Sequence, residues 1–171
     1  MVNVRDGVFT KIVRDIRDKT TISELMFSLI IGFIFINLSL LIHESSHVIM
    51  ARILGVEAGI NNLLMFTGSS VIGSTTPSQF ILIALAGPMG AFLYGLYCYF
   101  IEKDSIIRVA GIVSFFYSVI PSLAPYLPNS DMFQAIASGL NPLVGWFIYL
   151  VIFAYCFKLI LEEITEGKFK V

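Results

Sequence analysis

Hydrophobic residues fill three long stretches of this 171-residue chain almost without interruption. Across residues 25–51, 58–101 and 109–157, only four side chains are charged or are histidine, namely His43, Glu44, His47 and Asp131. About 20 apolar residues in a helix cross the roughly 30 Å hydrocarbon core of a bilayer. The pattern therefore predicts an all-α polytopic membrane protein.

These stretches divide into about four predicted transmembrane helices. Their expected positions are residues 22–54, 78–101, 105–127 and 142–161. Asn141 followed by Pro142 is a favourable cap and first turn for the last of them. Residues 131–139 are too few to cross a bilayer, and we expect a broken or half-inserted helix whose backbone is covered by protein or water.

The connection between the first two helices has a different pattern. Residues 55–77 are not apolar enough to span a membrane and not charged enough for an ordinary surface loop. Within them, residues 63–67 and 70–72 flank Gly68. This arrangement predicts a small membrane-associated β-hairpin with its turn near that glycine.

Both ends of the chain are more polar than its middle. Residues 1–24 place hydrophobic side chains at helical spacing among charged ones, which is typical of an amphipathic helix on a membrane surface or of a solvated leader. We therefore divide the chain into this segment, a membrane core at 25–162 and a tail at 163–171. The chain is 57% hydrophobic with a net charge of -1, and this composition gives no indication of a nucleic-acid partner.

The motif HESSH at residues 43–47 interrupts the first hydrophobic stretch and holds the only two histidines of the chain. Positions i and i+4 share one helix face, so both imidazoles can bind one ion while Glu44 projects toward a bound water. This is the H-E-x-x-H arrangement of zinc hydrolases. The alternative, a polar pair packed inside the bundle, is disfavoured because ionisable groups at mid-membrane cost about 3 kcal/mol each.

A catalytic zinc ion needs a third protein ligand and one open position. Asp131 is the obvious donor, since no other charged residue lies between residues 109 and 157. The sequence Asn-Ser-Asp at 129–131 is also typical of a helix cap, and the two roles are compatible. We therefore predict one Zn²⁺ per chain, bound by His43, His47 and Asp131.

With this motif in a membrane setting, the chain resembles the site-2 protease family of intramembrane zinc metalloproteases. The resemblance covers residues 25–136 and rests on three elements, which are HESSH at 43–47, PSQF leading into ALAGP at 77–88, and SLAP followed by NSD at 122–131. It implies that the two histidines and Asp131 bind zinc. It also implies that Glu44 is the general base in peptide-bond hydrolysis.

This chain departs from the family pattern at two asparagines. Gly-Pro-x-x-Asn is replaced by GPMGA at 87–91, and Asn-x-x-Pro by SLAP at 122–125. No metal ligand is lost, so we expect metal binding to be retained. Substrate positioning and oxyanion stabilisation would then fall to other groups, for which Asn129 and Gln134 are candidates.

The resemblance implies an endopeptidase that works in the lipid bilayer on a transmembrane protein substrate. A helical substrate must be extended before hydrolysis, because its backbone is hydrogen-bonded internally. A strand of the predicted hairpin would take up such a substrate by β-strand addition, or would only cover the site. The hairpin residues that would contact the substrate are Ser69, Ser70 and Val71.

Two other functions fit the same sequence. The absence of the two family asparagines favours a catalytically silent relative that binds zinc and acts as a membrane adaptor. A membrane-bound peptidase for soluble peptides would instead use a glutamate as third ligand. The glutamates that follow the motif are Glu57, Glu102, Glu162, Glu163 and Glu166.

Charges indicate how the chain is oriented. With four crossings, Arg52 lies on the same side of the membrane as the connections that carry the metal ligands. The other ten of the 11 lysines and arginines lie on the side of the two termini. The positive-inside rule then predicts a cell-membrane protein with cytoplasmic termini. The resemblance implies instead a zinc site nearer the cytosol, and we favour the charge argument.

A reporter fused after Val171 tests this orientation. We expect activity from a reporter that functions only in the cytoplasm, because the basic residues keep the side of the termini cytoplasmic. Activity of a reporter that works only after export would contradict the predicted orientation.

Overall fold

The computed structural model describes residues 22–64, 67–100 and 105–165, and this part of the chain is mostly helical. Its elements are α2 (Ile22–Ile53), β1 (Ala58–Leu64), β2 (Thr67–Ile72), α3 (Pro77–Phe100), α4 (Ser105–Ser114), the π-helical η1 (Phe115–Val119), α5 (Ile120–Leu123), α6 (Asp131–Ala137) and α7 (Pro142–Thr165). Of the predicted surface segment at 1–24, residues 1–21 lie outside the described part of the chain. The end of the predicted tail, residues 166–171, also lies outside it.

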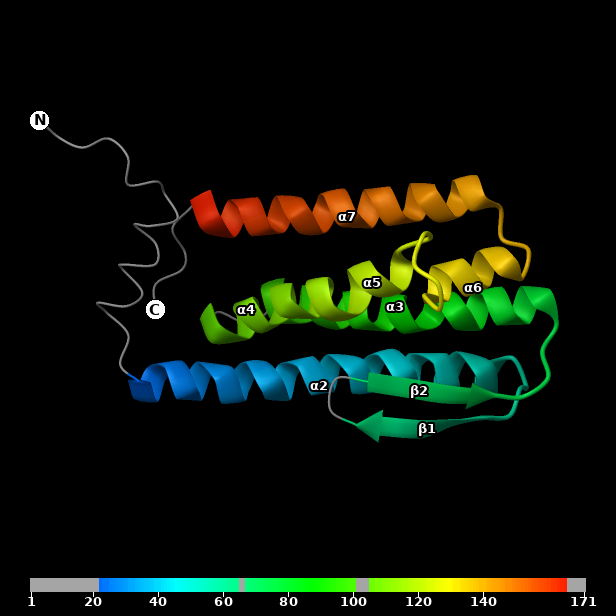
Figure 1. Cartoon of the computed structure of the whole chain (residues 1–171), viewed down its shortest axis with the longest axis horizontal. Coiled ribbons are helices and arrows are strands. Elements are labelled where there is room, and N and C mark those ends of the chain that lie inside the picture. The colour runs from blue at the N-terminus through cyan, green and yellow to red at the C-terminus, as the bar shows by residue number, and fades with distance from the viewer. Residues whose placement is uncertain (1–21, 65–66, 101–104, 166–171) are drawn as a thin grey trace, which may run out of the picture.

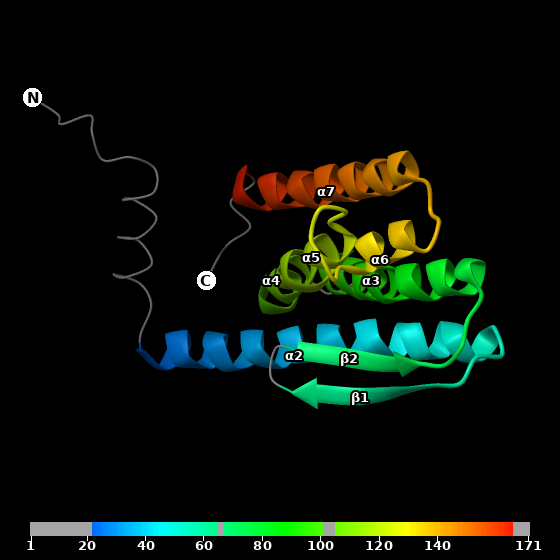
Figure 2. The same cartoon turned by 45° about the vertical axis from the view of Figure 1, so that its right-hand side comes forward.

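The helices are arranged in three tiers (Figures 1 and 2). α2 runs along one side with β1 and β2 beside its C-terminal half, and α7 runs along the opposite side. Between them lie α3, α4, η1, α5 and α6. The C-terminal half of α2 therefore faces segments that follow it much later in the sequence.

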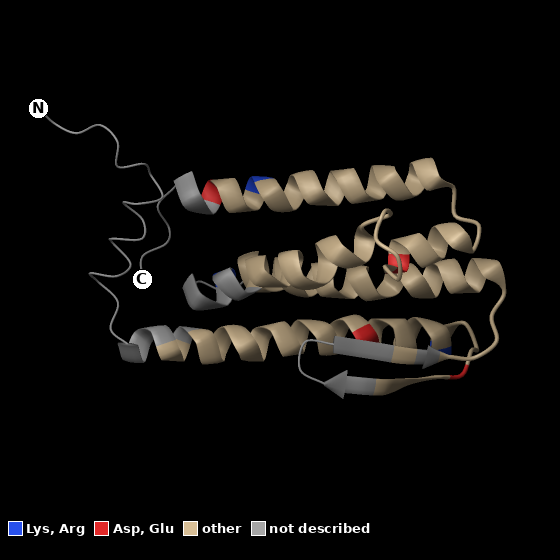
Figure 3. Ribbon diagram, viewed as in Figure 1, with Lys and Arg blue, Asp and Glu red and all other residues tan. Residues whose placement is uncertain are grey.

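In the part of the chain that the structure describes, three helices are long and apolar enough to cross a membrane. They contain Leu29–Ile53, Pro77–Phe100 and Pro142–Glu162, and they correspond to the first, second and fourth predicted membrane helices. α2 has 32 residues, which gives it a length of about 48 Å at 1.5 Å per residue. Charged residues lie mainly near the ends of the bundle, whereas two acidic positions lie within it, on α2 and at the start of α6 (Figure 3).

The third predicted membrane helix, at 105–127, differs from the expectation. α4 continues directly into η1 and α5, but the helix ends at Leu123 and its apolar part, Gly111–Leu123, is shorter than the other three. Pro121 has no N–H to donate to the preceding turn, and Pro125 favours the extended conformation of Ala124 before it (ψ 106°), which ends the helix at Leu123. A fourth crossing therefore stays a prediction.

Gly55 ends α2. Its φ of 74° is a conformation that residues with a side chain rarely adopt. The Gly55 N–H donates to Arg52 O at 3.1 Å and the Val56 N–H donates to Ala51 O at 2.9 Å, which are the two bonds of a Schellman motif. Val56 then packs with Ala51 and Ile83 of α3. The motif thus anchors the end of α2 on α3.

A capping box begins α3. Thr76 Oγ1 accepts a bond from the Gln79 N–H at 3.4 Å, and the Thr76 N–H donates to Gln79 Oε1 at 3.0 Å. Pro77 takes the first helical position, where a missing N–H is harmless. Gln79 Nε2 also donates to Leu54 O at 3.2 Å. One glutamine therefore joins the start of α3 to the end of α2.

β1 and β2 pair in antiparallel fashion between α2 and α3 in the sequence. Leu64 lies opposite Thr67, so two residues separate the strands. Gly68, which we expected at the turn, pairs with Leu63 inside the ladder. The expected turn position was wrong because a two-residue connection, the length most compatible with strand twist, lies before the glycine.

Asn141 caps α7, as the sequence predicts. Its Oδ1 accepts a bond from the Leu143 N–H at 2.9 Å. One turn later Gly145 is buried against α6, where a Cβ atom would lie 3.0 Å from Met132 Sδ. The close contact between these helices holds α6 in place beside the centre of the bundle.

Replacing Gln79 by Ala tests the junction between α2 and α3. We expect a loss of about 1 to 2 kcal/mol in the free energy of unfolding, because the Thr76 N–H loses its partner Gln79 Oε1 and the bond from Gln79 Nε2 to Leu54 O is removed. Reversible denaturation in mixed micelles measures it. Ser74→Ala, an exposed change in the same connection, is the control, and equal stability of the two variants would contradict this role.

Candidate metal centre

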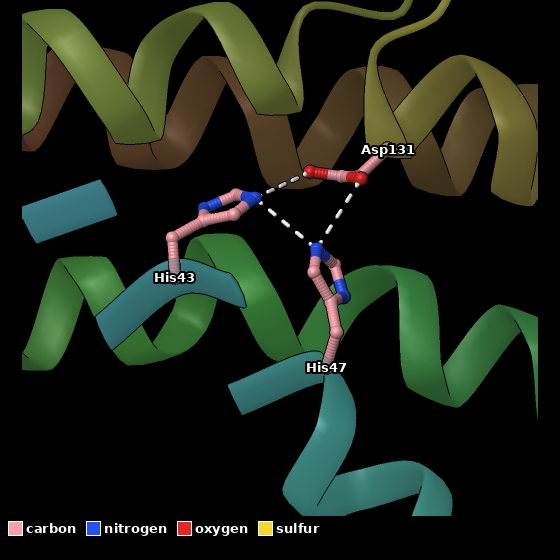
Figure 4. Close-up of side chains that lie close together, drawn as sticks. All are labelled: His43, His47 and Asp131. Carbon is pink, nitrogen blue, oxygen red and sulfur yellow. Dashed lines mark hydrogen bonds and ion pairs between the residues drawn. The ribbon is translucent and has the colours of Figure 1, made fainter. Parts of the chain in front are cut away.

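His43 and His47 face the middle of the bundle from α2. They are 5% and 4% exposed, and one helical turn separates them on the same face. Their Nε2 atoms lie 3.1 Å apart (Figure 4). Both imidazoles therefore direct the same ring nitrogen toward one point.

Asp131 reaches this point from the start of α6. Its Oδ2 lies 3.1 Å from His43 Nε2, and its Oδ1 lies 3.5 Å from His47 Nε2 (Figure 4). With one ligand atom taken from each residue, all three atoms lie within 4.8 Å of one another. The predicted ligands are thus brought together as a group that could hold a metal ion.

Ser130, and not Asp131, caps α6. Ser130 Oγ accepts a bond from the Phe133 N–H at 3.1 Å and donates to Ala124 O at 2.7 Å. Asp131 is the first residue of the helix, so its carboxylate is not needed for the cap. The serine fixes the turn, and the neighbouring carboxylate points toward the histidines.

α3 orients the ring of His47. The carbonyl oxygen of Ile83 lies 2.7 Å from His47 Nδ1, and a carbonyl can only accept, so this nitrogen carries the proton. In the neutral ring Nε2 then has the free lone pair. Such a bond is the usual partner of a metal-bound histidine. His43 Nδ1 is buried and has no hydrogen-bond partner among the described residues.

The converging atoms fit a cation. The lone pair of His47 Nε2 faces a second imidazole nitrogen and a carboxylate, so a cation placed between them would be attracted by all three groups. Ligand atoms held at about 2.1 Å in a tetrahedron around one zinc ion are about 3.4 Å apart. The two imidazole Nε2 atoms, 3.1 Å apart, are close to this value, and each also lies 3.1 or 3.5 Å from the nearer of the two Asp131 oxygens. Two imidazoles and one carboxylate are also a donor set that zinc accepts.

Glu44 and the three candidate ligands line one cavity of ≈ 680 Å³. Glu44 is 7% exposed and follows His43 directly in α2. The walls come from α2, β2, α3, η1, α5, α6 and the loop before α6. The cavity can therefore hold water and an extended peptide segment next to the carboxylate.

The predicted substrate-positioning residues are only partly assembled here. Asn129 and Gln134 are exposed and line the cavity, and Gln134 Nε2 donates to Asn129 O at 3.1 Å. Asn129 has a φ of 71°, which suits its place in the turn before α6. Ser70 also lines the cavity. The side chains of Ser69 and Val71 lie outside the described part of the structure.

The sequence did not single out a chain of buried serines beside the site. Ser39 Oγ lies 2.6 Å from Ser114 Oγ and 2.8 Å from Ser118 Oγ, so α2 is bonded to α4 and η1. Ser118 also lines the cavity. Ser39 lies four residues before His43 on the motif's own helix face, but this spacing does not show which serines it meets.

The glutamate alternatives find no support in the described part of the chain, where the cluster of candidate ligands consists of the two histidines and Asp131. Glu57 is exposed near the end of α2, and Glu162 lies 3.5 Å from Lys158 on α7. The side chains of Glu102, Glu163 and Glu166 lie outside the described residues.

Comparison of the chain with protein-family models, with curated proteins and with solved structures gives no match. Evidence about its function therefore comes from the residues of the site and their geometry.

Metal analysis of purified protein tests the centre. We expect one divalent ion per chain, with an affinity for Zn²⁺ that falls more than about 100-fold in His43→Ala and in Asp131→Ala, since even the loss of a partner of a ligand costs 10- to 100-fold. Glu44→Gln, which keeps all three ligands, is the control and should bind normally. Full retention of zinc by Asp131→Ala would remove this residue from the ligand set.

Proposed function

We propose that this chain is an integral membrane zinc metalloendopeptidase that hydrolyses peptide bonds in or near transmembrane segments of other proteins. The observation that carries the proposal is the convergence of His43, His47 and Asp131 on one point, with the carboxyl group of Glu44 in the same cavity. The resemblance of the motifs to site-2 proteases supports the same reaction.

His43, His47 and Asp131 would hold the zinc ion, which supplies Lewis-acid polarisation of a substrate carbonyl. Glu44 accepts a proton from the attacking water as the new C–O bond forms at the scissile carbon. It then donates this proton to the leaving nitrogen as the C–N bond breaks. The products are a carboxylic acid and an amine, and Glu44 is again a carboxylate.

The remaining walls would orient the substrate and limit water. Asn129 and Gln134 place amide groups at the cavity, where they can bond an extended backbone. Ile72 and Phe80 offer apolar surface on the opposite elements β2 and α3. Such a mixture suits an unwound membrane segment, because its apolar side chains and its freed backbone groups both need partners.

The membrane setting of this proposal follows from the three long apolar helices. We propose a cell-membrane location with α2, α3 and α7 as spanning helices and the stretch from α4 to α5 as a fourth crossing. His47 is six residues before the end of α2, which is about 9 Å along the helix. The centre would therefore lie inside the bilayer, nearer the end of the bundle that carries Arg52.

A catalytically silent zinc-binding adaptor is the second candidate, and one observation favours it. Ala91, at the position where the family pattern has an asparagine, is fully buried in the apolar core and has no side-chain donor for a substrate. Ser122, at the second altered position, does line the cavity. Only a measurement of turnover separates the two candidates.

Turnover is measured with zinc-loaded protein in liposomes and a tagged single-span protein as substrate. We expect cleavage in or near the span by the wild type and a rate lower by about 10²- to 10⁴-fold for Glu44→Gln, because the proton acceptor is lost. Mass spectrometry locates the cut. The matched control is Glu57→Gln, which alters an exposed glutamate outside the cavity lining. Zinc-loaded wild type that cleaves none of several such spans would favour the adaptor.

A further inference from the structure

Two glycines of α3 lie where this helix meets the metal-bearing turn of α2. A Cβ atom added at Gly87 would overlap the imidazole of His47, with Cδ2 at 2.8 Å and both Nε2 and Cε1 closer still. A Cβ atom at Gly90 would overlap the side chain of Ser46. Small residues allow such close approach of helices in membranes. At Gly87 the partner is a candidate metal ligand.

The same helix also bonds the opposite edge of this ring. Ile83 O accepts the bond from His47 Nδ1, and Ile83 and Gly87 are four residues apart on one face of α3. The carbonyl therefore fixes one ring nitrogen, while the bare backbone of the glycine borders the other. Together they leave the buried imidazole little freedom to rotate.

We propose that Gly87 is a positioning residue of the metal centre, whose missing side chain allows His47 Nε2 to point at His43 and Asp131. This inference rests on the proposed zinc site. A methyl group at residue 87 must be accommodated by movement of the ring, since the three atoms nearest to an added Cβ all belong to it. Zinc–nitrogen distances tolerate shifts of only about 0.2 Å, so a displaced ring binds the metal less well.

Two other glycines provide matched controls. Gly32 on α2 has nothing within 4 Å of an added Cβ atom, so Gly32→Ala should be neutral. An added Cβ at Gly95, also on α3, would overlap the ring of Phe115. Gly95→Ala therefore disturbs the packing of α3 without touching a ligand. Comparison with it separates loss of the site from general destabilisation.

Gly87→Ala is tested by titration with Zn²⁺ against a chelating dye and by the visible absorption of bound Co²⁺, whose d–d bands report ligand geometry. We expect an affinity for Zn²⁺ about 10- to 100-fold weaker than in the wild type, as for loss of a hydrogen-bond partner that orients a ligand, and an altered Co²⁺ spectrum. Gly32→Ala and Gly95→Ala should keep the wild-type affinity and spectrum. Wild-type affinity and spectrum in Gly87→Ala would overturn the proposal.

A double substitution covers the case in which Gly87→Ala does not fold. In a His47→Ala background the ring is gone, so Gly87→Ala should leave the unfolding temperature of His47→Ala unchanged. Equal destabilisation by Gly87→Ala with and without the ring would overturn the proposal.

His43→Ala distinguishes failure of this inference from failure of the zinc site. If His43→Ala loses zinc and Gly87→Ala does not, only the positioning role is wrong. If His43→Ala also binds zinc as the wild type does, the zinc site and the positioning role are both overturned. No activity assay enters either comparison.

Discussion

Two imidazoles and two carboxyl groups lie close together in the interior of an otherwise apolar bundle, and the rest of the structure is arranged around them. Burial of ionisable groups is unfavourable unless they are paired, hydrogen-bonded or bound to a metal. Here the three candidate ligands face one another at 3.1 to 3.5 Å, and Glu44 adjoins the cavity that they line. A cation shared by the three groups would relieve the repulsion between these lone pairs.

α3 is the element that makes this arrangement rigid. Its N-terminus is joined to α2 through Gln79, which bonds Leu54 O. Further along, Ile83 O accepts a hydrogen bond from the N–H at His47 Nδ1. The first contact sets the position of the two helices and the second sets the orientation of one ring. Chain packing and ligand geometry are thus controlled from the same helix.

On the other side of the cavity, backbone irregularities place the polar groups. The regular helix ends after Pro121, and the chain then turns through Asn129 before α6 begins at Asp131. A continuous helix through this region would separate the carboxylate from the histidines. Broken helices are tolerated at membrane depth where protein or water covers the free backbone, and a polar cavity meets this condition.

The sequence by itself determined the helical class, the main helix positions and the pair of histidines that share one helix face. Uncharged runs of about 20 residues have few alternatives to a membrane helix, and two histidines four residues apart share a face wherever the segment is helical. Asn141 with Pro142 likewise acts locally, which is why its role as a cap was predictable.

Only the tertiary structure decided which carboxylate meets the histidines, which carbonyl orients His47 and which glycine borders it. These contacts join residues far apart in the sequence, and no local pattern encodes them. The turn of the hairpin was misplaced for a related reason, since strand register depends on the partner strand. The serine chain from Ser39 to Ser118 was missed because a serine in a membrane helix is uninformative until its neighbour in space is known.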